Sequence, residues 1–184
     1  MLNTVTYPKG IDIPIRKMQE YLHSSLLDVW GIDTDQYQSY GRCYRNKQDR
    51  GYIAEVYTGE NEYKEVYFDD TLSAISFFGI TDSIKQGVGQ TANVHLIYFV
   101  DLQKLKPTLT NRADEEVRLD VMQSIGASKL GFSFKSVDLW LENVLREYSG
   151  SYRDERLKVV DMHPVHCFRL NFELNYNIKQ TYCP

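Results

Sequence analysis

The stretch His166-Cys-Phe-Arg-Leu-Asn-Phe-Glu-Leu-Asn-Tyr176 alternates between two kinds of side chain along its whole length. The residues of one parity are apolar: Phe168, Leu170, Phe172, Leu174 and Tyr176. The residues of the other parity are mostly polar: Cys167, Arg169, Asn171, Glu173 and Asn175. Because successive side chains of a strand point to opposite faces, this pattern predicts a half-buried β-strand with one apolar and one polar face. A single strand cannot bury that face alone, so we expect a sheet and a covering layer.

Three further segments form the framework of the predicted fold. Residues 92–102 carry apolar side chains on both parities, which is typical of a central strand covered on both faces. Residues 13–30 and 112–125 carry apolar side chains at every third or fourth position, which predicts two amphipathic helices. We expect Asp12 to cap the first helix and Gly31 to end it.

Shorter segments complete the prediction. Two turn compositions separate three strand-like pieces, which predicts two successive hairpins over 42–45, 52–57 and 63–68. The remaining predicted elements are a strand at 73–80, a flexible loop at 81–91, a short strand at 132–134 and a helix at 136–148. Thr110 or Asn111 is expected to cap the helix at 112–125.

These elements predict a single α+β domain over residues 1–184, with a mainly antiparallel sheet packed by two or three helices. A chain of 184 residues is the usual size of one domain. Residues 1–11 are expected to form an extended N-terminal arm, and residues 177–184 a C-terminal tail.

The composition excludes several classes of protein. The net charge of −4 argues against sequence-independent DNA binding, which needs a basic surface. Three widely spaced cysteines do not form a disulfide framework, and they are typical of a reducing cytosol. The first residues lack the apolar core of a signal peptide, and no run approaches the roughly 20 apolar residues of a membrane span.

Tyrosine is unusually frequent, with 14 residues against two tryptophans. Tyrosine is enriched at protein interfaces because it combines apolar area with a hydrogen-bonding tip. Half-exposed strands also favour it, so both interpretations stay open.

Four residues before and within the first quoted strand are possible zinc ligands: Asp161, His163, His166 and Cys167. A structural zinc site needs a fourth ligand from a paired motif, and the sequence has no second Cys/His pair. In a strand, His166 and Cys167 also point to opposite faces. The simpler interpretation is that Pro164 sets the entry into the strand and the histidines bond to nearby backbone.

A second possibility for chemistry is a metal-dependent nuclease. Glu62 and Lys64 have the Glu-x-Lys spacing in which carboxylates hold a divalent ion and lysine supports the attacking water. Asp49 or Glu55 would supply the upstream acid, and Asp69 with Asp70 could add a ligand. The same spacing also arises by chance in a charged strand.

Other catalytic patterns are missing. The sequence has no Gly-x-Ser-x-Gly elbow and no Gly-x-x-x-x-Gly-Lys-Ser/Thr phosphate loop. We therefore expect no catalytic residues, no bound cofactor and no metal site.

Several segments together resemble a family of small virion proteins from tailed bacteriophages of gut Bacteroidales, including relatives of the crAss-like phages. The segments that carry the resemblance are 10–22, 40–46, 68–78, 112–118, 146–150 and 161–169. Proteins of this kind are similar in layout to phage tail-terminator and tail-completion proteins, which are small α/β domains that form rings.

The resemblance implies a structural protein that forms a homo-oligomeric ring, a hexamer or dodecamer, at the head-tail neck or in the tail. It implies neighbouring connector or portal and tail proteins as partners, with genomic DNA passing through the lumen without specific binding. It also implies assembly in the host bacterial cytoplasm, localisation in the virion, no membrane partner and no active site. A metal-dependent phage nuclease or processing enzyme is the alternative, and a third possibility is a module that binds a host protein through a tyrosine-rich face.

Overall fold

The main sheet of the computed structural model has seven strands in the order β1-β2-β6-β8-β10-β9, with β7 paired to β8. The structure describes residues 1–49, 51–59, 61–66, 68–81, 85–86, 89–108, 112–148, 150 and 162–177. The strands of this sheet are β1 (Leu2–Asn3), β2 (Tyr37–Arg42), β6 (Ala74–Ile80), β7 (Lys85–Gln86), β8 (Gln90–Asp101), β9 (Phe132–Leu139) and β10 (Val165–Tyr176). The β1-β2 and β2-β6 pairs are parallel, whereas the other pairs are antiparallel.

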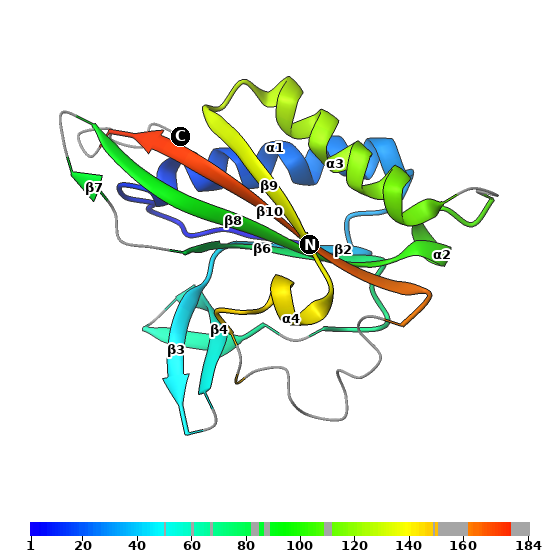
Figure 1. Ribbon diagram of the computed structural model, residues 1–184, viewed down its shortest axis with the longest axis horizontal. Helices are drawn as coiled ribbons and strands as arrows, with labels where there is room; N and C mark the ends of the chain where they lie inside the picture. The colour runs from blue at the N-terminus through cyan, green and yellow to red at the C-terminus, as the bar shows by residue number, and fades with distance from the viewer. Residues whose placement is uncertain are drawn as a thin grey trace.

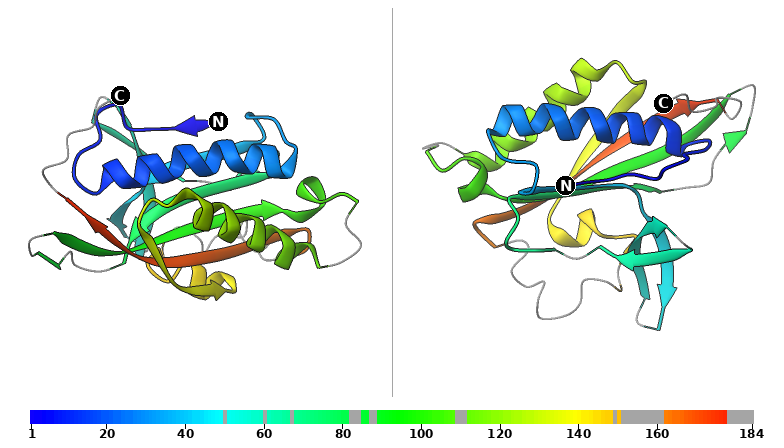
Figure 2. Two further views of the ribbon diagram at one scale, coloured as in Figure 1. Left: turned by 90° about the horizontal axis from the view of Figure 1, so that it is seen from above. Right: turned by 180° about the vertical axis from the view of Figure 1, so that it is seen from behind.

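The remaining elements cover the two faces of this sheet. Helices α1 (Asp12–Trp30) and α3 (Ala113–Ser128) lie on one face, as Figures 1 and 2 show. The other face carries the short helix α4 (Leu141–Val144) and a separate antiparallel sheet of β3 (Tyr44–Gln48), β4 (Gly51–Gly59) and β5 (Glu62–Glu65). The one-turn helix α2 (Leu102–Leu105) follows β8. The predicted α+β domain is thus confirmed, although the described chain has two one-turn helices beyond its two long ones.

Strand β10 confirms the first prediction and corrects part of it. It pairs with β8 over its whole length and with β9 on the other side, so it is an internal strand. The apolar parity faces the two long helices, in a core that includes Phe168 and Leu170. The opposite parity is not a solvent face throughout, because Cys167 and Arg169 are both 0% exposed. The second layer covers this part of the strand.

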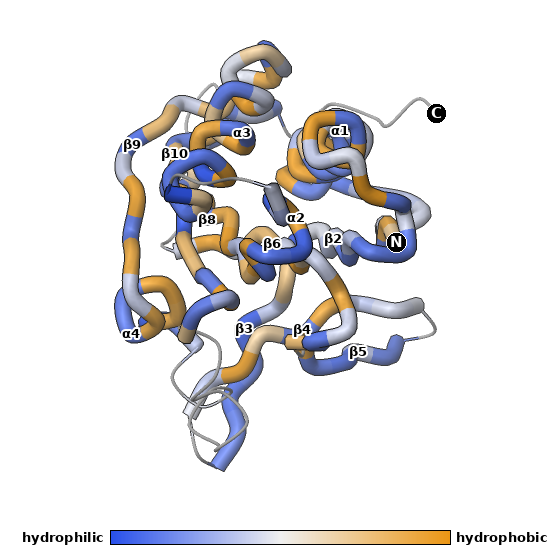
Figure 3. Tube along the Cα trace, turned by 90° about the vertical axis from the view of Figure 1, so that its right-hand side faces the viewer, coloured by the Kyte–Doolittle hydropathy of each residue, from blue (hydrophilic) through white to orange (hydrophobic). Residues whose placement is uncertain are grey.

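The core therefore has two halves, separated by the main sheet. The larger half lies under α1 and α3, and Figure 3 shows hydrophobic segments of these helices turned toward the sheet. The smaller half lies under α4 and the small sheet, and it includes Ala54, Val56, Phe77, Phe99 and Val144. Strand β8 contributes to both halves, as expected for a central strand covered on both faces.

Both long helices form where they were predicted, but both predicted N-caps are wrong. The N-cap of α1 is Ile11 without a side-chain bond, and Asp12 lies in the first turn. Gly31 ends α1 in the left-handed conformation, at φ 64°, as predicted. The N-cap of α3 is Arg112, whereas Thr110 and Asn111 lie outside the described residues.

The small sheet confirms the two successive hairpins, with different boundaries. The strand expected at 42–45 is divided, because Arg42 ends β2 in the main sheet and Tyr44 begins β3 in the small one. Strand β5 ends at Glu65 rather than continuing to Phe68, and Tyr67 is outside the described residues. The strand expected at 73–80 is confirmed as β6.

The helix predicted at 136–148 is wrong for its first part. Strand β9 continues to Leu139 because Ser136 and Val137 pair with Asn171 and Leu170 of β10. The chain then turns at Trp140, at φ 64°, and only Leu141–Val144 is helical. The apolar residues of this segment are nevertheless buried, as their spacing suggested: Val144, Leu145 and Tyr148.

The N-terminal arm is partly a strand of the main sheet. Leu2 and Asn3 pair in parallel with Ser39 and Tyr40. The Gln19 amide of α1 donates to the carbonyl oxygens of Asn3 at 2.8 Å and Ser39 at 2.9 Å. These bonds tie the edge strand β1 and its neighbour β2 to α1. The predicted loop at 81–91 contains β7, but residues 82–84, 87 and 88 are outside the described part, as are residues 178–184 of the tail.

Replacing Gly79 with alanine should destabilise the fold. A Cβ atom at this position would lie 2.2 Å from both His95 Nε2 and Tyr148 Oη. Overpacking of this kind costs about 1–3 kcal/mol, so we expect a lower free energy of unfolding in urea. Gly126→Ala is the matched control, because a Cβ there meets nothing within 4 Å and alanine favours a helix. Equal stability of Gly79→Ala and wild type would contradict the packing described here.

Candidate functional site

A buried network of charged side chains surrounds Arg169 on the second face of the main sheet. The Arg169 guanidinium donates to both carboxylate oxygens of Glu147, with Nη2 to Oε1 at 2.9 Å. Its Nε donates to Asn171 Oδ1 at 2.7 Å, and Nη2 also donates to Thr81 Oγ1 at 3.0 Å. The two-oxygen contact with Glu147 is the strong geometry of arginine-carboxylate pairs. These bonds compensate a cation whose burial would otherwise be very costly.

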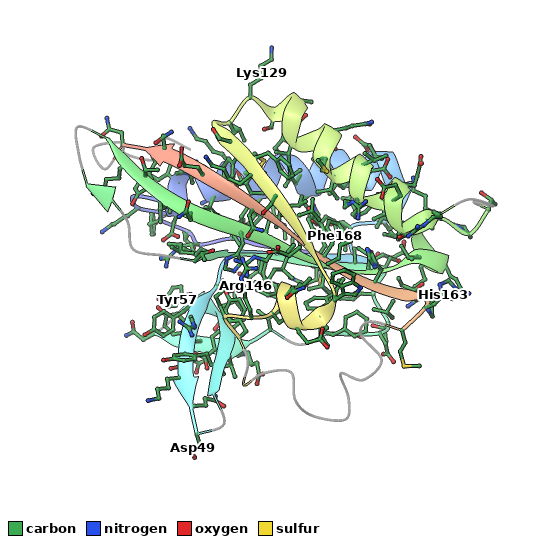
Figure 4. All side chains as sticks on the ribbon, viewed as in Figure 1. Asp49, Tyr57, Lys129, Arg146, His163 and Phe168 are labelled. Carbon is green, nitrogen blue, oxygen red and sulfur yellow. The ribbon has the colours of Figure 1, made fainter. Side chains whose placement is uncertain are left out.

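A second layer of partners completes the network. Asp138 Oδ2 accepts from Asn171 Nδ2 and from Arg146 Nη1, both at 2.8 Å. Arg146 Nε also donates to Glu147 at 3.2 Å. Figure 4 labels Arg146 beside α4, on the same side of the main sheet as the small sheet. Two arginines thus face two carboxylates, and the four formal charges balance.

The network connects to a buried histidine. Thr81 Oγ1 lies 3.1 Å from His95 Nδ1, and Tyr148 Oη lies 3.0 Å from His95 Nε2. Burial, reinforced by the positive charge of Arg169, holds the pKa of His95 well below its usual range, so this histidine is neutral at pH 7. Burial also raises the pKa of the Tyr148 hydroxyl, which keeps it protonated.

The arrangement is suited to holding the chain together rather than to a reaction. Arg169, His95 and Tyr148 are almost completely buried, and their polar atoms bond to one another and to neighbouring side chains. Cys43 is also buried, and burial raises the pKa of its thiol, so it is a poor nucleophile. The network fastens the segment that follows α4 to β10.

Sequence reasoning placed Arg169 on a polar face and missed this network. Cys167 lies on the same face of the strand as Arg169, and cysteine is usually buried. Its presence there could have indicated that this face is covered. Glu147 was not identifiable as its partner, since the predicted helix at 136–148 placed it in a different element.

The three possible zinc ligands that the structure describes do not form a metal site. Asp161 lies outside the described residues. His163 Nε2 lies 3.5 Å from Gln103 Nε2, and the His166 ring stacks on Phe168 at 5.8 Å between centroids. Cys167 points to the opposite face, as the strand alternation predicted, and is buried in the smaller core.

The residues of the nuclease alternative do not form a metal site within the described ranges. Glu62 and Lys64 are exposed on β5, Asp49 is at the turn before β4, and Glu55 is on β4. Asp69 instead accepts bonds from Thr71 Oγ1 at 2.6 Å and Thr71 N at 2.9 Å, and these bonds lower the pKa of its carboxyl. Within the described ranges, no three His, Cys, Asp or Glu side chains gather as metal ligands would.

An exposed aromatic surface lies on the small sheet. Tyr63 contacts Tyr44 at 5.7 Å and Tyr57 at 5.2 Å between ring centroids. Tyr44 and Tyr63 are 52% and 50% exposed. A hollow of about 150 Å³ lies between these three tyrosines, Val5 and the Asp12-Arg42 ion pair, whose closest atoms are 2.5 Å apart. We call the surface formed by Tyr44, Tyr57 and Tyr63 the tyrosine face.

Comparison with known proteins gives no relative: no family model matches the chain, and no curated protein matches it. None of the helices in the described ranges has the length and apolar character required to cross a membrane.

Replacing Arg169 with methionine should strongly destabilise the protein. The substitution leaves the Glu147 carboxylate buried without its main cation, and breaking a buried pair costs about 3–5 kcal/mol. Urea unfolding would measure the loss. The matched control is Arg112→Met, which removes an exposed arginine-aspartate pair and should leave the urea midpoint unchanged. Similar effects of the two substitutions would contradict a special role for Arg169.

Stability should decrease as the pH falls below about 6.5, partly because of His95. The unfolded chain binds a proton at this histidine near its ordinary pKa, whereas the folded chain does not. The unfolded state therefore binds more protons, and the free energy of unfolding falls by up to about 1.4 kcal/mol per pH unit.

The comparison of wild type with His95→Gln isolates this contribution, because His23 also has a lowered pKa and remains in both proteins. We expect a shallower dependence of the unfolding free energy on pH between pH 6.5 and 5.5 in the variant. Identical slopes would show that His95 is not held neutral.

Proposed function

We propose that the chain is a structural bacteriophage virion protein that forms a homo-oligomeric ring at the head-tail neck or in the tail, in a tail-terminator, tail-completion or connector role. The observation that carries the proposal is the tyrosine face, an aromatic surface exposed on a small sheet that projects from the domain. The resemblance found in the sequence supplies the phage context. The ring, a hexamer or dodecamer, would be assembled in the host bacterial cytoplasm and become part of the virion.

The tyrosine face has the properties of a protein interface. Tyrosine adds large contact area at a small cost in conformational entropy, and its hydroxyl can bond across a contact. Three such rings already touch one another on β3, β4 and β5, so little ordering remains for a partner to impose. A ring of identical subunits needs two different surfaces on each copy, since its contacts are head-to-tail.

The charge of the protein agrees with a passive DNA channel. A net charge of −4 disfavours tight binding of phosphates, so DNA could pass a lumen built from such subunits without being held. Neighbouring connector or portal and tail proteins would bind the remaining surfaces of the ring.

The described residues favour this proposal over the nuclease alternative. In that alternative, carboxylates such as Glu62 and Asp69 hold the metal ion and Lys64 supports the attacking water, yet no three His, Cys, Asp or Glu side chains gather as metal ligands among the residues described. The buried network at Arg169 holds two chain segments together, which also suits a structural protein.

The mass of the purified protein tests the proposal. Light scattering with negative-stain images of each peak should show hexameric or dodecameric rings, because the exposed tyrosine face gains contact area on assembly. A protein that stays monomeric over the accessible concentration range, and also with purified phage necks or tails as a template, would contradict the ring.

A pair of variants gives the control for this measurement. Tyr44→Ser/Tyr63→Ser removes two exposed rings of the tyrosine face and should shift the population to monomers. Leu119→Ser/Trp140→Ser removes two exposed apolar side chains elsewhere, of 41% and 67% exposure, and should leave the rings intact.

A further inference from the structure

Two glutamates on the tyrosine face have no ion pair among the residues that the structure describes. Glu55 of β4 is directly opposite Glu65 of β5, and Tyr44 of β3 is opposite Glu55 on its other side. Residues directly opposite in antiparallel strands share a face, so both carboxylates lie among the tyrosines. Like charges in this position repel, and the described part of the chain gives neither carboxylate an ion pair. A partner that brings positive charge would relieve this repulsion.

A groove elsewhere on the same chain has the opposite character. It has a volume of about 580 Å³ and lies between the first turns of α1, the end of α3 and the end of β10. Lys17 and Lys129 line it and are exposed, and neither forms an ion pair within the described ranges. Apolar side chains form part of the remaining lining, namely Ile13, Pro14 and Leu130, together with Tyr176, two asparagines and two glycines. We call it the lysine groove.

The two surfaces cannot meet within one copy. Figure 4 labels Tyr57 on the small sheet and Lys129 at the turn after α3, on opposite sides of the main sheet. The small sheet and the two long helices cover different faces, as Figure 2 also shows. A contact between the surfaces therefore has to join two copies.

We propose that the tyrosine face of one copy docks into the lysine groove of the next. Glu55 and Glu65 would face Lys17 and Lys129, and the tyrosine rings would cover the apolar part of the groove. The contact is heterologous, because it joins two different surfaces, and such contacts close into rings when the rotation between copies allows it. This inference rests on the proposed ring and names its subunit interface.

Complementary charge identifies the occupant as a second copy. Within the described residues, each surface carries two charges without an ion pair, negative on the tyrosine face and positive in the lysine groove, and each combines them with apolar contact area. A nucleic acid would satisfy the lysines alone and would be repelled by the glutamates of the tyrosine face. A copy of the same chain satisfies both surfaces at once.

Charge reversal with rescue tests the contact. Glu55→Lys/Glu65→Lys should lose the ring peak in light scattering, because lysines would then face lysines, and like charges at a contact are strongly unfavourable. Lys17→Glu/Lys129→Glu should lose it for the same reason. The variant with all four substitutions restores opposite charges and should recover the ring peak. Far-UV circular dichroism and a urea midpoint close to that of wild type show that each variant is folded.

The control variant is Asp28→Lys/Glu142→Lys, which changes the net charge as much as Glu55→Lys/Glu65→Lys but at exposed sites outside both surfaces. It should assemble as wild type does. Rings that persist in both double reversals would overturn the contact and leave the proposed ring standing, whereas a wild type that stays monomeric even with purified phage necks or tails as a template would overturn both.

Binding of a duplex DNA oligonucleotide to the wild type and to Lys17→Glu/Lys129→Glu tests whether the lysine groove is instead a nucleic-acid site. If the oligonucleotide binds wild type, if Lys17→Glu/Lys129→Glu abolishes that binding, and if the rings of this variant are unchanged, the groove is a nucleic-acid site and the subunit contact is wrong. We expect no binding at physiological salt.

Discussion

The complete burial of Arg169 in the middle of β10 is the constraint on which the second layer of the structure depends. A cation in the interior is tolerated only with a well-placed counter-charge and hydrogen bonds. Glu147 supplies the counter-charge, so the chain after β9 has to turn back across the sheet. Trp140, at φ 64°, makes that turn, and α4 then brings Tyr148 against His95. The position of α4 and of the segment that follows it is therefore tied to one buried charge, whereas the small sheet covers the rest of this face.

The strongest periodic segments of the sequence predicted their structure correctly. Strands β8 and β10 and helices α1 and α3 were found because their apolar patterns report directly on burial. Strand β2 was predicted only at its last residue, because Gln38 and Ser39 are polar residues that are buried in a strand between β1 and β6. The segment at 136–148 was misassigned since its first residues pair with β10, and long-range pairing overrides local spacing.

The functional surfaces were less accessible to prediction. The abundance of tyrosine suggested an interface or half-exposed strands, and the structure places Tyr44, Tyr57 and Tyr63 together on one half-exposed sheet face. The three tyrosines come together because of the strand register in two hairpins, and the amino-acid composition does not determine that register. The lysine groove combines Lys17 and Lys129 from distant parts of the chain, and only the packing of α1 against the end of α3 and β10 brings them to one groove.

A cryo-electron microscopy reconstruction of the assembled protein, alone or in the phage neck or tail, would show whether copies of the chain form a ring and which surfaces join them. We expect a closed ring in which Tyr44, Tyr57 and Tyr63 of each copy are buried against the groove that contains Lys17 and Lys129 of its neighbour. A ring in which the tyrosine face lies in solvent would contradict the proposed interface. Particles in which the protein forms no ring would contradict the proposed function itself.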